Sequence, residues 1–252
     1  MTRSLSVLLG IAGLLALSMG VYALSGRRPD ADAERKGAEF AGGTGNFLVH
    51  WLMWALAPAE SLFLRLGASA DLFNFVGLAF GLCAGLLIAA GRLDLGGWAI
   101  ALGGIADVLD GRVARARGVS SDYGKFIDST LDRFVEAFVF VGFAFYLRST
   151  AYGSTLAAAA LAGSLLVSYA RARGETVGVA GPKGLMQRAE RLVLTSVVCL
   201  FDPPLTARWA WPPGSLIAGA LALIAAASFG TAVYRTWAIA LALRRDKPGH
   251  IG

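Results

Sequence analysis

Four aspartates stand at helical intervals in one short stretch of an otherwise apolar chain. The stretch reads DVLDGRVARARGVSSDYGKFIDSTLD and runs from Asp107 through Asp110 and Asp128 to Asp132. Residues three or four apart lie on the same face of a helix, so the aspartates form two pairs, one on each of two helices. A short turn between these helices makes them antiparallel neighbours. We therefore expect the two pairs of carboxylates to face each other.

Converging carboxylates predict a site for hard divalent cations. Four of them would repel one another strongly unless cations neutralised them, and oxygen-only ligands favour Mg²⁺ or Mn²⁺. Two such ions bridging a diphosphate form a known arrangement for displacement at phosphorus. The histidines, His50 and His250, are isolated, and Cys83 and Cys199 lie singly within apolar runs. Carboxylates are therefore the ligands that this sequence offers.

Small and basic residues accompany the aspartates. Gly111 follows Asp110 and removes a side chain where a nucleotide could approach the backbone, and Gly124 does the same on the next helix. Ala114 keeps that face open, and Arg115 can donate to phosphate oxygens. The alternative is a structural charge cluster in which the aspartates pair with nearby arginines. The cost of charge in an apolar setting favours a functional site.

The elements that hold these residues must be apolar helices. Hydrophobic residues make up 56% of the 252, charged residues only 16%, and 32 residues are glycine. This composition is typical of a helical protein that crosses the membrane several times. The net charge of +6 comes from basic residues scattered between apolar runs. That pattern favours loops that face anionic membrane lipids and argues against a nucleic-acid partner.

Six core membrane spans are expected, at about residues 72–91, 95–116, 123–147, 151–172, 188–203 and 214–243. The first of them carries Gly77, Gly81 and Gly85, a stripe of small residues that predicts close helix contact. These spans define an all-α integral membrane fold with a six-helix core.

Two further apolar segments precede the core. The run Leu5 to Leu24 is long enough to cross a bilayer, and we expect a retained anchor. A cleaved signal peptide is the alternative, but only Arg3 precedes the run and the small-residue cleavage pattern is poor. A later stretch contains Trp51, Trp54 and Pro58 and is expected to be an interfacial helix, with an extra span as the alternative.

The chain therefore divides into five expected parts. They are an N-terminal anchor (1–26), a polar linker (27–44), an interfacial amphipathic helix (45–66), a six-helix catalytic transmembrane domain (67–245) and a cytoplasmic tail (246–252).

The distribution of positive charge predicts the orientation. One set of helix ends carries Arg112, Arg115, Arg117, Lys125, Arg133, Arg171, Arg173, Lys183, Arg188, Arg191, Arg244, Arg245 and Lys247. The other set carries mainly Arg92, Arg148 and Arg208. The positive-inside rule places the first set in the cytoplasm. We expect a multi-pass protein of the inner (plasma) membrane, with the aspartates at the cytoplasmic ends of the second and third spans.

The aspartate stretch resembles the complete signature of the CDP-alcohol phosphotransferase family. The matching pattern is Asp107-x₂-Asp110-Gly111-x₂-Ala114-Arg115-x₈-Gly124-x₃-Asp128-x₃-Asp132. The resemblance extends over roughly residues 45 to 245. It implies a six-helix membrane fold, a homodimer and a polar cavity open to the cytoplasm. It also implies transfer from a CDP-linked lipid or alcohol to a hydroxyl acceptor, with release of CMP and with two divalent metal ions.

The resemblance also implies roles for individual residues. Asp107, Asp110 and Asp128 would hold the metals, and Asp132 would touch the second metal and act as the base for the acceptor hydroxyl. Gly111, Arg115 and Ser121 would contact the cytidine diphosphate. A family stretch of the form Pro-Asn/Asp-x-x-Thr also meets the nucleotide. Here it reads Ala70-Asp71-Leu72-Phe73-Asn74, so proline and threonine are replaced while Asp71 and Asn74 remain candidate contacts.

A second basic region indicates a phosphorylated acceptor. It reads SYARARGETVGVAGPKGLMQRAERLVL. Positive-inside loops would explain the charge alone, but Arg188 and Arg191 stand three apart at the head of a hydrophobic helix. That placement predicts charge-assisted binding of a phosphate.

The same region resembles the branch of the family that makes phosphatidylinositol phosphate from CDP-diacylglycerol and inositol phosphate. The resemblance implies that Arg171, Arg173 and Arg191 bind the acceptor phosphate, with Arg133 and Arg188 as further candidates. The sequence departs from the branch at Gly174, where alanine is usual. Glycerol phosphate as acceptor, or a CDP-inositol as donor, are alternatives within the family.

Two alternatives from other classes are an ion or proton carrier and a membrane scaffold without catalysis. A carrier would place polar residues through the bilayer midplane, whereas these aspartates cluster at one end. The intact signature argues against an idle scaffold.

Overall fold

The protein is built of helices. The computed structural model describes residues 3–26, 28–29, 33–34, 45–119, 121–182 and 184–245. Most of the expected linker 27–44, the expected tail 246–252 and Lys183 lie outside these residues. The helices are α1 (Arg3–Leu24), α3 (Asn46–Arg65), α4 (Ala70–Ala89), α5 (Leu93–Ala116), α6 (Asp122–Tyr146), α7 (Gly153–Thr176), α8 (Arg188–Trp209) and α9 (Ser215–Arg245).

Helices α4 to α9 coincide with the six expected core segments, with one clear difference at the end of α8. That helix ends at Trp209 rather than at about residue 203, and it continues through Pro203 and Pro204. Proline lacks a backbone donor and usually ends or kinks a helix. The helix continues past the prolines, and the Thr206 hydroxyl donates to the Asp202 carbonyl at 2.6 Å.

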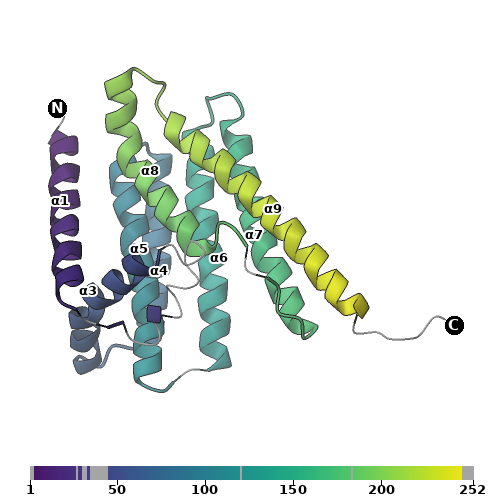
Figure 1. Ribbon diagram of the computed structural model, residues 1–252. Coiled ribbons are helices and arrows are strands. Elements are labelled where there is room, and N and C mark those ends of the chain that lie inside the picture. The colour runs from purple at the N-terminus through teal and green to yellow at the C-terminus, as the bar shows by residue number, and fades with distance from the viewer. Residues whose placement is uncertain are drawn as a thin grey trace.

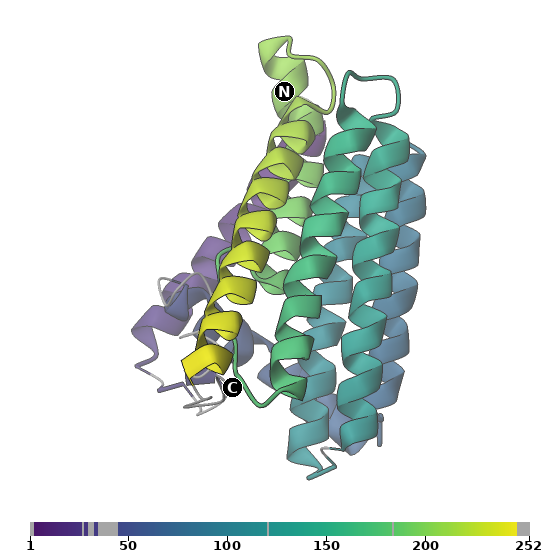
Figure 2. The same ribbon diagram turned by 90° about the vertical axis from the view of Figure 1, so that its right-hand side faces the viewer.

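The core helices form an antiparallel bundle (Figure 1). Helix α4 packs against α5 and α6, α5 packs against α8, α6 packs against α7, and α7 packs against α9. The second view shows α9 crossing α7 at an angle (Figure 2). Helix α8 begins part of the way along α5 and α6, whose hairpin extends beyond it (Figure 1). The start of α8 is therefore placed beside the middle turns of the aspartate-bearing helices.

The glycine stripe on α4 lies in close helix contacts, as expected, with Gly81 and Gly85 facing α6 and Gly77 facing α5. A Cβ atom added at Gly81 would lie 2.7 Å from Val135 Cγ2, and one added at Gly85 would lie 2.4 Å from the carbonyl oxygen of Phe138. On the facing helix, a Cβ added at Gly142 would lie 2.5 Å from the carbonyl oxygen of Gly85. The two backbones can approach this closely only because these positions lack side chains.

We expect Gly85→Ala to destabilise the protein by about 1–3 kcal/mol, the usual cost of overpacking. The neighbouring atom is a backbone carbonyl, which cannot turn aside as a flexible side chain can. Thermal unfolding in detergent would measure the effect. The matched control is Gly219→Ala on α9, because a Cβ there meets nothing within 4 Å. Equal unfolding temperatures for the two variants would contradict the close approach.

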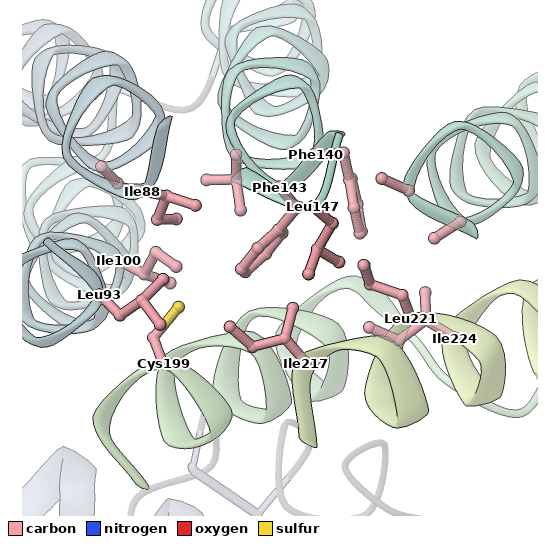
Figure 3. Packing of buried hydrophobic residues seen from close by; sticks show 14 of the residues in the cluster. Ile88, Leu93, Ile100, Phe140, Phe143, Leu147, Cys199, Ile217, Leu221 and Ile224 are labelled. Atoms are coloured by element: carbon pink, nitrogen blue, oxygen red, sulfur yellow. The ribbon is translucent and has the colours of Figure 1, made fainter. Parts of the chain in front are cut away.

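The main hydrophobic core fills the half of the bundle opposite the α5–α6 turn. It joins side chains of all six core helices, α4 to α9 (Figure 3), and the labelled members are Ile88, Leu93, Ile100, Phe140, Phe143, Leu147, Cys199, Ile217, Leu221 and Ile224. A smaller cluster contains the buried residues Phe73, Leu109 and Val113. Leu109 directly precedes Asp110, so this second cluster fixes the turn of α5 that carries the aspartates.

Helices α1 and α3 stand outside the bundle. Helix α3 is inclined to α5 and lies beside its C-terminal half (Figure 1). Its Phe63 meets Phe73 edge to face at 5.0 Å between ring centroids. The indole nitrogen of Trp51 donates to Ser18 Oγ of α1 at 3.1 Å, which ties the N-terminal helix to α3.

Four helices of the described residues are long and apolar enough to cross a membrane. They are α3, α4, α7 and α9, and Gly10–Leu24 forms a shorter apolar helix. Helix α3, which we expected to lie in the interface, meets the same criterion of length and composition. Helices α5, α6 and α8 complete the core and carry the charged residues of the expected site.

Candidate active site

Three of the four aspartates meet between α5 and α6. Asp107 and Asp110 on α5 and Asp128 on α6 each offer one carboxylate oxygen, and these oxygens lie within 4.8 Å of one another. Asp110 is buried and the other two are half-buried. We call these three residues the carboxylate group. It has the size and the oxygen chemistry of a site for a divalent cation.

The turn between the two helices is what brings this group together. Helix α5 ends at Ala116, and Gly118 follows in the turn with a φ of +66° that few other residues adopt. The amides of Gly118 and Val119 donate to the carbonyls of Arg115 and Ala114 at 3.0 and 3.1 Å. Helix α6 then begins with Ser121, whose hydroxyl accepts from the amide of Gly124 at 3.1 Å. This cap uses the hydroxyl expected to contact the nucleotide.

Asp132 lies beside the carboxylate group but is joined to it through an arginine. Arg188, the first residue of α8, donates from Nη1 to Asp107 Oδ1 and lies with Nη2 next to Asp132 Oδ1, both at 2.7 Å. Arg133 Nη1 lies 3.5 Å from Asp132 Oδ2. The spacing alone suggested four converging carboxylates. The structure instead shows a group of three and a fourth held by Arg188.

A narrow pocket opens at the aspartates and continues between the helices. Its polar side is formed by Asp107, Asp110, Asp132 and Arg188. Its other side is largely apolar and is lined by Phe73, Asn74, Gly77, Leu78, Gly81, Ala99, Ile100, Gly103, Gly104, Leu131, Val135, Val139 and Leu192. The pocket therefore combines charged groups with an apolar path between α4, α5 and α6.

Of the expected nucleotide contacts, Asn74 lines this pocket, and Asp71, Gly111, Arg115 and Ser121 lie outside its lining. The Arg115 guanidinium folds back over the preceding turn, so that a Cβ added at Gly111 would lie 3.1 Å from its Nη1. Asn74 is buried and lines the pocket. Asp71 is half-buried in the first turn of α4, which Ser69 caps by accepting from the amide of Leu72 at 3.2 Å.

The expected acceptor arginines do not converge on one cavity. Arg171 and Arg173 are exposed at the end of α7, where Arg171 pairs with Glu175 at 2.9 Å. Of the five candidates, Arg188 lines the pocket and Arg133 reaches Asp132 at its side.

Arg191 is placed differently from the expectation. It is only 2% exposed, and its Nε and Nη2 donate to Glu136 Oε1 at 2.9 and 2.6 Å. Its Nη1 donates to the carbonyl of Met186 at 2.7 Å. A buried guanidinium needs such partners, because an unpaired charge in this setting is costly. Arg191 is thus turned toward α6 rather than into the pocket.

The sequence pattern did not single out two buried acidic residues, Glu136 and Asp202. Glu136 is 1% exposed and follows Asp132 by one turn on α6. Asp202 is fully buried and accepts from the amides of Gly214 and Leu216 at 2.9 Å each, which caps the start of α9. An acid inside an apolar run was the available signal for both.

Known proteins of similar sequence include phosphatidylinositol phosphate synthases. The chain is 38% identical over 152 residues to the phosphatidylinositol phosphate synthase of Streptomyces avermitilis, which is 58% of this chain and 62% of that protein. The alignment thus spans less than two thirds of that relative. The chain is also 34% identical to the phosphatidylinositol phosphate synthase of Mycobacteroides abscessus. That alignment spans 172 residues, which are 64% of this chain and 78% of that protein.

Solved structures show the same fold. The phosphatidylinositol phosphate synthase of Mycobacterium tuberculosis with manganese and citrate superposes with a TM-score of 0.63 at 27% identity, over 72% of this chain and 87% of that one. Its complex with CDP-diacylglycerol gives 0.61 at 28% identity, over 72% and 92%. Together with the apolar helices, this likeness identifies a multi-pass membrane protein.

The family model described as CDP-alcohol phosphatidyltransferase matches residues 68–231, which run from the start of α4 into α9 and contain the carboxylate group, Asp132 and Arg188. The chain belongs to the CDP-alcohol phosphatidyltransferase family.

Proposed function

We propose that the protein transfers the phosphatidyl group of CDP-diacylglycerol to a hydroxyl of inositol phosphate and releases CMP. The observation that carries this proposal is the carboxylate group beside a pocket that Arg188 lines with a half-buried positive charge. The named activities of the relatives support the choice of donor and acceptor.

Asp107, Asp110 and Asp128 would hold two divalent cations, Mg²⁺ or Mn²⁺. The donor set fits this use, because it consists of carboxylate oxygens on two adjacent helices within 4.8 Å of one another. When bound, the cations would stabilise the negative charge that develops on the diphosphate. The manganese in a related structure supports a divalent ion.

The other residues would bind and orient the substrates. Arg115 and the open backbone at Gly111 would receive the cytidine diphosphate, together with Asp71, Asn74 and Ser121. The lipid chains would follow the apolar side of the pocket between α4, α5 and α6. Arg188 at the pocket and Arg133 beside Asp132 would attract the acceptor phosphate, together with the exposed Arg171 and Arg173 at the end of α7. Arg191 would join them only after leaving Glu136.

Asp132 would act as the general base. It takes the proton from the acceptor hydroxyl, whose oxygen forms a bond to the lipid-side phosphorus. The bond between this phosphorus and the oxygen bridging to CMP breaks, and CMP leaves with the electron pair. The short contact to Arg188 fixes the Asp132 carboxylate at the pocket wall.

We further propose the placement in the membrane. Six core spans, α4 to α9, follow an N-terminal anchor within residues 1–26, a linker at 27–44 and an interfacial α3 within 45–66, with a cytoplasmic tail at 246–252. The basic residues at the α5–α6 turn and at the ends of α7 and α9 support a cytoplasmic site. The inner membrane and a homodimer are part of the same proposal.

The test is CMP release by the purified protein with CDP-diacylglycerol, Mn²⁺ and a panel of acceptors. We expect product with inositol phosphate, little with glycerol phosphate or free inositol, and none after chelation of the metal. A CDP-inositol donor is tested in a separate arm. Product with glycerol phosphate alone would overturn the acceptor assignment. No CMP release with any acceptor would favour a carrier or a scaffold.

A further inference from the structure

The loop between α7 and α8 connects two groups of basic residues proposed to meet the acceptor. Arg173 lies in the last turn of α7, and Arg188 begins α8. The path of the intervening loop therefore sets the distance and the angle between these two arginines.

Side chains of α9 hold this loop by its backbone. Arg235 Nε donates to the carbonyl of Pro182 at 3.0 Å, and the Thr231 hydroxyl donates to the carbonyl of Leu185 at 2.8 Å. Arg235 Nη1 also donates to the carbonyl of Val167 on α7 at 3.1 Å. Thr231 and Arg235 stand one turn apart on α9, so both donate hydrogen bonds to the loop from the same face of this helix.

The loop lies directly on α9 because small residues allow it. A Cβ added at Gly184 would lie 1.9 Å from Thr231 Cγ2. A Cβ added at Gly174 would lie 2.6 Å from Ile239 Cδ1 and 2.8 Å from the carbonyl oxygen of Val179. Gly174 is the position where the sequence departs from alanine, and the close contact with Val179 explains the glycine.

Burying the Arg235 side chain carries a desolvation cost, because a guanidinium is charged. It is only 7% exposed, and within the described part of the chain it has no carboxylate within ion-pair distance. Its hydrogen bonds go to backbone carbonyls alone. A buried guanidinium without a direct ion-pair partner depends on its hydrogen bonds to offset the loss of water. For Arg235 these bonds join α9 to the α7–α8 loop and to α7, so they fix the path of the loop.

We propose that Arg235 and Thr231 are positioning residues for the phosphorylated acceptor. They touch no substrate. They fix the α7–α8 loop so that Arg173 and Arg188 stand at the separation that the acceptor phosphate requires. The inference rests on the proposed function, because the acceptor arginines belong to it.

The first test is Arg235→Lys. Lysine keeps the charge, but its single ammonium cannot reproduce the planar fork that reaches both Pro182 and Val167. We expect the KM for inositol phosphate to rise about tenfold, since two hydrogen bonds to the loop and its neighbour are disturbed. The KM for CDP-diacylglycerol and Mn²⁺ binding, followed by electron paramagnetic resonance, should remain unchanged.

A matched pair of threonine variants separates positioning from general stability. Thr231→Val removes the bond to Leu185, whereas Thr236→Val removes only a bond to the carbonyl of Ala232 within α9. We expect faster amide hydrogen exchange in residues 177–187 and a raised acceptor KM for Thr231→Val alone. If both valine variants behave alike, or if Arg235→Lys raises the KM of donor and acceptor equally, the positioning role is wrong.

The exchange measurement does not depend on turnover. Unchanged exchange of the loop in Arg235→Lys and Thr231→Val overturns the positioning role whatever acceptor is used. A wild-type protein that makes no product, yet shows the expected exchange differences, overturns the proposed function and leaves the contact between α9 and the loop supported.

Discussion

Asp128→Asn is expected to lower CMP release by at least about 1,000-fold, which corresponds to about 4 kcal/mol of transition-state stabilisation. Asparagine keeps the shape of the side chain and removes the charge. Asp128 is the contribution of α6 to the carboxylate group, while Asp107 and Asp110 come from α5. Without it, the carboxylate group is reduced to the two residues on α5, and the charge developing on the diphosphate loses much of its stabilisation.

The measurement has a readout besides turnover. Titration with Mn²⁺, followed by electron paramagnetic resonance, should show weaker binding or fewer bound ions in Asp128→Asn. The control is Asp122→Asn on the same helix, where the carboxylate is exposed and pairs with Lys125 at 3.2 Å. This control removes the same charge and should retain near-normal turnover and metal binding. An equal loss in both variants would mean that the general negative charge of the turn, not a specific site, matters.

Local periodicity explains what the sequence could predict about this site. The sequence predicts that Asp107, Asp110, Asp128 and Asp132 meet, because their spacing places each pair on one helix face and the short turn makes the two helices antiparallel neighbours. The apolar runs likewise located helices α4 to α9, since a span of the bilayer demands a minimum length of apolar sequence. The close contact at Gly85 was expected from the small-residue stripe for the same reason.

Contacts between helices far apart in sequence could not be predicted in this way. Arg188 holds Asp107 and Asp132 because α8 begins beside the middle of α5 and α6, which depends on the packing of the whole bundle. The neighbouring Arg191 is turned to Glu136 for the same reason. The sequence shows that Arg188 and Arg191 begin α8, but it does not show which acidic residues they contact.

The residues that shape the α7–α8 loop show a further limit of sequence reasoning. Arg235 stands in an apolar helix, where a charged residue indicates a structural or functional role, as it does for Glu136 and Asp202. Its partners are carbonyl oxygens, however, which carry no signal in the amino-acid sequence. Only the path of the backbone shows what this arginine does.

Asp132→Asn is expected to reduce kcat by about 10²–10⁴-fold, the usual contribution of a general base. The amide cannot accept the proton of the acceptor hydroxyl, so attack on phosphorus requires a poorer base. The carboxylate group of Asp107, Asp110 and Asp128 is left in place, and tight Mn²⁺ binding should largely survive. Asp94→Asn, an exposed acid in the first turn of α5, serves as the charge-matched control and should keep normal turnover.

A comparison with Arg188→Gln distinguishes the base from an ion-pair partner. Both variants remove the ion pair between Arg188 and Asp132, but only Asp132→Asn removes the proton acceptor. If Asp132 is the base, Arg188→Gln should mainly raise the KM for the acceptor, and its kcat at saturating acceptor should exceed that of Asp132→Asn by at least about tenfold. Equal kcat values would mean that Asp132 serves to hold Arg188 at the pocket, and another group would then have to take the proton.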